Sequence, residues 1–159
     1  MMINLLKSQY QLVKETRAVV FLYLESEVQQ DLLAAVDAFN GKSIADMMVH
    51  VANTYMAWAG NFALAMQRSY YRESDCTTMA QLRVIFEDID LIMDQFITSF
   101  AECPDTAVNG YKWADKYIET DAYRIFTHIL THEFHHKGQI MTMSRLLGHT
   151  PPDTDVMRF

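Results

Sequence analysis

Apolar residues recur at intervals of three and four along most of the chain, which is the spacing of helices that bury one face. Four stretches carry this pattern, and their predicted ranges are about 3–28, 43–66, 78–100 and 121–147. No strand-like alternation of comparable length accompanies them. The pattern therefore predicts an all-α protein built as a four-helix bundle.

The ends of these helices carry local signals. Ser43 with Asp46 fits a capping box, in which a hydroxyl and an acidic or amide side chain each satisfy a free backbone amide, and Thr78 with Gln81 fits the same motif. Gly148 is placed to end the last helix, because glycine readily adopts the left-handed conformation found there. These signals predict the starts of the second and third helices and the end of the fourth.

Between the third and fourth helices, residues 101–119 contain Pro104 and Gly110 and show no sustained helical period. We expect a long connection here, followed by a helix that is capped by Thr120 or Asp121. A connection of this length leaves room for a crossover, so the sequence does not require a simple up-down-up-down order.

Length and composition limit the class of protein. A chain of 159 residues fits a single domain, 1–159, and its net charge of −7 argues against binding a nucleic acid, which needs Lys and Arg to neutralise phosphates. Cys76 and Cys103 lack a C-x-x-C spacing, which favours a reducing compartment. The amino-terminal stretch lacks the apolar core of a signal peptide, and no run approaches the roughly 18 apolar residues of a membrane span. We therefore expect a cytoplasmic protein.

The candidate chemistry lies in "HILTHEFHHKGQI", residues 128–140, which holds four histidines in nine positions. His128, His132 and His136 follow one another at the one-turn spacing that lets two imidazoles reach the same ion, and His135 lies beside them. His128 and His136 are about 12 Å apart along a helix, too far to share a zinc ion whose bonds are about 2.0–2.1 Å long. The helix can therefore offer one adjacent pair, unless the cluster is simply a solvated polar face.

A third ligand must then come from elsewhere, and only His50 and His149 remain. His50 is the better candidate, because it lies in the second predicted helix at the margin of the apolar stripe, whereas His149 follows the end of the fourth helix. A histidine at such a margin can also be a hydrogen-bonded structural residue. Three neutral imidazoles would leave one position for water, as in catalytic rather than structural zinc sites.

His132, Glu133 and His136 also spell H-E-x-x-H, the zinc-binding motif in which the glutamate is the general base of a metalloprotease. The metzincin extension is missing, since Gln139 and Thr142 stand where Gly and His are needed. No glutamate follows Glu133 to serve as a downstream ligand. A protease is therefore a remote alternative, and Glu133 is expected to be a surface residue or to contact a metal ligand.

Three segments, "KSIADMMVHVANTYMAW", "HILTHEFHHKGQI" and "LLGHTPPDTD", resemble the DinB/YfiT-like family of metalloproteins, apart from Lys137 where Arg is commoner. The resemblance implies a four-helix bundle in up-down-down-up order. It also implies a divalent metal, zinc or nickel, on His50, His132 and His136. Members of the family often form homodimers, and several are metal-dependent S-transferases that use bacillithiol, mycothiol or glutathione.

We therefore expect a metal-dependent enzyme, a thiol S-transferase or a hydrolase, that activates water or a low-molecular-weight thiol for attack on a small electrophilic substrate. His128 and Glu133 are candidates for tuning the metal ligands. A pocket wall could be formed by aromatic residues that otherwise belong to the core, namely Tyr55, Trp58, Phe62 and Trp113. The alternative is a dimeric, stress-related bundle that binds a metal or ligand without turnover.

Overall fold

The computed structural model describes residues 2–103, 105–112 and 115–158, and within them it confirms the four predicted helices. π-helical segments, Leu24–Val28 and Met56–Ala63, extend the first and the second helix. The four helices are α1 (Met2–Tyr23), α2 (Ile44–Tyr55), α3 (Met79–Phe100) and α4 (Ala122–Leu146).

Both predicted capping boxes are present. The Ser43 and Thr78 hydroxyls accept hydrogen bonds from the backbone amides three residues ahead. In turn, the side chains of Asp46 and Gln81 accept hydrogen bonds from the backbone amides of Ser43 and Thr78. Asp121 is the cap of α4, and its carboxylate accepts from the backbone amide of Arg124 at 2.7 Å. Gly148 follows α4 with φ of +93°, as its predicted role requires.

The long connection predicted over 101–119 is present, but it contains a hairpin that the sequence did not predict. Two strands, β1 (Ala107–Lys112) and β2 (Lys116–Asp121), pair in antiparallel register, with Ala107 opposite Asp121. In β1 the inward positions are Val108, Gly110 and Lys112, while Tyr111 faces solvent with 71% of its surface exposed. The strand alternates in burial but not in hydrophobicity, so its period of two is hidden in the sequence.

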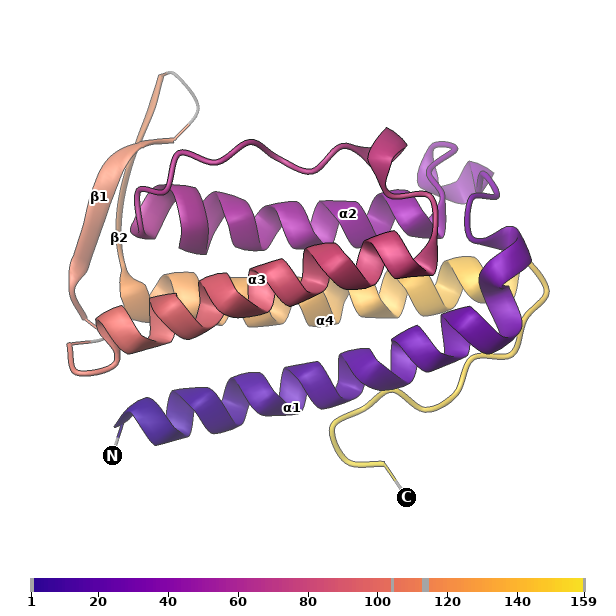
Figure 1. Cartoon of the computed structure of the whole chain (residues 1–159), viewed down its shortest axis with the longest axis horizontal. Helices are drawn as coiled ribbons and strands as arrows, with labels where there is room; N and C mark the ends of the chain where they lie inside the picture. Colours follow the sequence, from indigo (N-terminus) through magenta and orange to yellow (C-terminus); the bar gives the residue numbers. More distant parts are fainter. Residues whose placement is uncertain (1, 104, 113–114, 159) are drawn as a thin grey trace.

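The segment 64–78 runs back along α2 before α3 begins. The Asn53 side chain holds this segment, because it donates to the Tyr71 carbonyl and accepts from the Tyr71 amide, both at 2.9 Å. Further along, Glu73 reaches Lys42, which lies just before α2. In Figure 1 the colours accordingly advance from right to left along both α2 and α3, and from left to right along α1 and α4.

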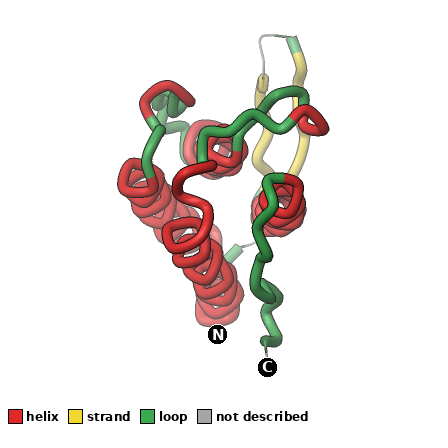
Figure 2. The backbone as a smooth tube through the Cα atoms, turned by 90° about the vertical axis from the view of Figure 1, so that its right-hand side faces the viewer, coloured by secondary structure: helices red, strands yellow, loops and turns green. Residues whose placement is uncertain are grey.

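All four helices contribute to one hydrophobic core, and the hairpin stands at one end of the bundle. Figure 2, viewed from the end, shows the helices side by side with the two strands rising above α4. None of the described helices combines the length and the apolar content needed to cross a membrane. The largest fully buried side chains include Leu24, Tyr55, Met56, Leu82, Ile89, Phe96, Ile125 and Met143.

Candidate metal centre

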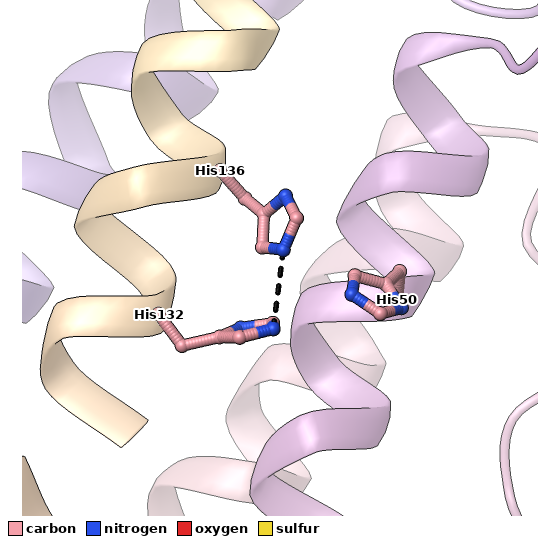
Figure 3. Close-up of side chains that lie close together, drawn as sticks. All are labelled: His50, His132 and His136. Atoms are coloured by element: carbon pink, nitrogen blue, oxygen red, sulfur yellow. Dashed lines mark hydrogen bonds between the residues drawn. The ribbon is translucent and has the colours of Figure 1, made fainter. Parts of the chain in front are cut away.

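Three histidines from two helices converge where α2 faces α4 (Figure 3). The Nε2 atoms of His132 and His136 are 3.1 Å apart, and the His50 ring centroid lies 5.1 Å and 4.7 Å from theirs. One ring nitrogen from each residue lies within 4.8 Å of the others, so the group could hold a metal ion. His149 is placed elsewhere and contacts Asp31 at 2.9 Å. Of the two candidates for the third position, only His50 therefore joins the pair.

The hydrogen bonds around the rings fit this use. Nδ1 of His136 donates to Oε1 of Gln139 at 2.6 Å, which leaves its Nε2 with a free lone pair. That Nε2 faces Nε2 of His132 at a distance close to the edge of a tetrahedron with bonds of about 2.0–2.1 Å. Nδ1 of His132 is buried and has no hydrogen-bond partner among the described residues, so Nε2 carries the polar contacts of this ring.

Electrostatics keep the three rings neutral. Burial, followed by repulsion from the neighbouring histidines, lowers the pKa of His132 to about 3. Burial is also the main reason why the pKa values of His50 and His136 lie below the usual range. A metal ion binds the neutral imidazole, so it would not have to displace a proton from these rings at neutral pH.

His128 and His135 flank this group without belonging to it. The His128 ring lies 5.6 Å from His132 and packs edge-on against Trp58 at 5.1 Å, and the His135 ring lies 4.9 Å from His136. Both side chains are exposed. The pair on α4 that meets His50 is therefore His132 with His136, and the tuning role of His128 stays a prediction.

Glu133 is not a surface residue, and that expectation was wrong. It is buried, and Arg17 of α1 donates to its two oxygens, from Nε and from Nη2, at 2.8 Å each. The Tyr55 hydroxyl donates to the same carboxylate. None of the described hydrogen bonds of Glu133 reaches a histidine. Its carboxylate faces the core, which argues against the general base of an H-E-x-x-H protease.

Sequence reasoning missed Arg17, although a signal was present. Arg17 lies on the same face of α1 as Val13 and Val20, so a charge interrupts the apolar stripe. It also donates from Nη1 to Asp90 of α3 at 2.7 Å. A charge on a buried helix face is rarely left unpaired, so its position predicts a partner, but not which one.

The predicted aromatic wall is only partly where it was expected. Tyr55 is fully buried and bonded to Glu133, so it belongs to the core and not to a pocket wall. Trp58 lies beside His128, packs against Phe62 at 5.6 Å, and has the ammonium of Lys112 at 3.5 Å from its ring centre. Its role as a wall stays a prediction, and Trp113 lies outside the described residues.

A cavity of about 330 Å³ opens on the other side of the centre, beside His50 and His136. Its wall comes from the turn before α2, from the first turns of α2 and from the segment 64–78, which only the tertiary structure brings together. No local pattern in the sequence indicates it. Besides the two histidines, the lining includes Phe39, Asn40, Lys42, Asp46, Met47 and Glu73.

Comparison with known proteins gives one family. A family model described as the DinB family matches residues 2–159, a range that contains all four helices and the three converging histidines. No curated protein is similar enough to the chain to be matched to it.

Proposed function

This chain belongs to the DinB family, and from that premise we propose that it is a metal-dependent enzyme with His50, His132 and His136 as the ligands of one zinc or nickel ion. The observation that carries the proposal is the meeting of three imidazoles with lowered pKa values from α2 and α4. Such a donor set suits zinc and nickel, which accept imidazole nitrogen readily.

The arrangement favours chemistry at the ion over a purely structural role. Three protein ligands leave a position for a reacting group, and a divalent ion supplies Lewis-acid activation of water or of a thiol near neutral pH. Gln139 orients His136 by its hydrogen bond. The cavity beside His50 and His136 gives a small molecule access to the same place. We propose transfer of a low-molecular-weight thiol to a small electrophile, or hydrolysis of that electrophile.

A second candidate is a dimeric bundle that binds a metal or a ligand without turnover. The contacts of Glu133 favour it, because they direct this buried carboxylate toward Arg17 and away from the three histidines. The described hydrogen bonds give no carboxylate to His50, His132 or His136. Incubation of the protein with thiols and electrophiles separates the two candidates: turnover supports the enzyme, and its absence with every thiol and metal supports binding alone.

For the chain as a whole we propose one domain, residues 1–159, with its helices in up-down-down-up order. We propose that it acts in the cytoplasm, on a small molecule and not on a nucleic acid. The return of the segment 64–78 along α2 supports this helix order. We also propose a homodimer. Exposed leucines on α1, namely Leu5, Leu12 and Leu22, support it because they offer apolar surface for a second copy.

The ligand assignment is tested by elemental analysis of protein purified without an affinity tag. We expect about one zinc or nickel per chain in the wild type and clearly less in His132→Ala. Loss of a ligand should weaken metal binding by about 100-fold or more, which exceeds the typical effect of losing a residue that only contacts a ligand. His135→Ala is the matched control, because its ring is adjacent but lies outside the group. Full metal content in His132→Ala would show that the assignment is wrong.

A further inference from the structure

The cavity beside the metal centre has an ion pair in its wall. Nζ of Lys42 lies 2.8 Å from each carboxylate oxygen of Glu73, so one ammonium group bridges both oxygens. The two residues come from different segments, since Lys42 precedes α2 and Glu73 belongs to the segment that returns along it. About half of each side chain is exposed, 51% and 45%. The pair is therefore reachable from solvent and from the cavity.

The ion pair and the histidines share this cavity. His50 and His136 line it together with Lys42 and Glu73. A molecule that fills the cavity would therefore contact both charges and two of the three histidines.

The pair can open without disturbing the backbone that carries it. An exposed ion pair is screened by water and salt and contributes little to stability. The backbone on either side is held by other bonds, those of the capping box between Ser43 and Asp46 and those between Asn53 and Tyr71. Lys42 and Glu73 can therefore separate, and each can pair with a ligand group of opposite charge.

We propose that this cavity binds a ligand that carries an ammonium and a carboxylate group on the same carbon, the head group of an α-amino acid. Its carboxylate accepts hydrogen bonds from Lys42 while its ammonium donates to Glu73, so one ion pair is replaced by two. The inference rests on the proposed function in one respect, because it takes His50 and His136 as the end of the cavity where the ligand reacts.

Size and charge agree with such a ligand. A volume of about 330 Å³ is near the lower end for small-molecule pockets, which range from about 300 to 1,000 Å³. Asp46 adds a second carboxylate to the lining, and this carboxylate also accepts a hydrogen bond from the backbone amide of Ser43. A divalent ion on the three neutral histidines would outweigh the excess of carboxylates over Lys42, which favours a ligand whose reacting end is anionic, such as a thiolate.

The test uses three probes that lack a free thiol: S-methyl-L-cysteine, its N-acetyl derivative without the ammonium group, and S-methylcysteamine without the carboxylate. Binding to the full chain is measured by nuclear magnetic resonance titration, both as purified and after treatment with a chelator. We expect S-methyl-L-cysteine to bind at least about fivefold more tightly than either analogue, a ratio that reflects roughly the net contribution of one hydrogen bond.

Each variant should remove one part of this preference. Lys42→Met should weaken the probes that carry a carboxylate by about fivefold and should not weaken S-methylcysteamine, whose ammonium no longer competes with Lys42 for Glu73. Glu73→Gln should weaken only the probes that carry an ammonium group. Lys7→Met is the matched control, because it breaks a similarly exposed ion pair with Asp94 outside the cavity. It should change none of the three affinities.

Two results would overturn the inference. One is equal binding of the three probes, or equal weakening of all of them by either variant, which would mean that the ion pair only shapes the loop. The other is binding that disappears with the metal and ignores both variants, which would mean chelation by the probe. Because the chelator-treated protein is titrated without turnover, failure of the proposed enzyme would appear separately, in the assays with thiols and electrophiles.

Discussion

Glu133→Gln tests whether the H-E-x-x-H glutamate is structural or catalytic. The substitution keeps the shape of the side chain and removes its charge. An amide cannot accept the Arg17 hydrogen bonds at both positions, so an amide nitrogen will face one of the Arg17 donors that now lie 2.8 Å away. We expect a less stable protein that still binds metal with the wild-type stoichiometry, since the carboxylate lies outside the group of histidines.

The size of the effect follows from burial. The Arg17 and Glu133 side chains are 6% and 8% exposed, and breaking a buried pair by removing one partner costs about 3–5 kcal/mol. Burial disfavours the charge of Arg17, but Glu133, Tyr10 and Tyr55 together outweigh it and hold the pKa of Arg17 above its ordinary value. Asp90 remains as a partner in the variant, so we expect a loss of about 3 kcal/mol. At roughly 2–4 °C per kcal/mol, the melting temperature should fall by about 6–12 °C.

Urea unfolding followed by far-ultraviolet circular dichroism measures this loss, with metal content determined on the same samples. Lys7→Met serves as the control, because an exposed pair contributes at most about 1 kcal/mol. Arg17→Met combined with Glu133→Leu should recover part of the loss, since it removes both buried charges but also takes away the partners of the Tyr55 hydroxyl and of Asp90. A change below about 1 kcal/mol in Glu133→Gln, or a loss of metal, would refute the structural role of Glu133.

Two further predictions concern the metal centre. Gln139→Ala should weaken metal binding by roughly 10-fold, because the His136 ring loses the acceptor that fixes its orientation, and calorimetric titration of zinc would show no change if that bond does not matter. In metal-free protein, stability should fall as the pH drops from about 6.5 to 3, because His132 with its pKa of about 3 stays neutral in the folded chain while unfolded histidine takes up a proton. Melting curves of wild type and His132→Asn should therefore diverge over this range, and parallel curves would contradict the lowered pKa.

Features with short-range causes were predictable from the sequence. The helices follow from the apolar period, and their starts follow from the Ser43 and Thr78 capping boxes, which involve residues only three positions apart. The ligand pair on α4 was within reach for the same reason, because spacing along one helix places His132 and His136 one turn apart. The hairpin was missed because Lys112 points inward and Tyr111 outward, against the usual pattern of hydrophobicity.

The amino-acid sequence by itself determined the four helices, their caps and the row of histidines on α4, since each depends on neighbours within one or two turns. Only the tertiary structure decided that His50 completes the group, that Lys42 meets Glu73 in the cavity wall, and that Glu133 faces the core. The bond between Arg17 and Glu133 joins residues 116 positions apart. Such a contact depends on how whole helices pack against each other, and no local pattern encodes that packing.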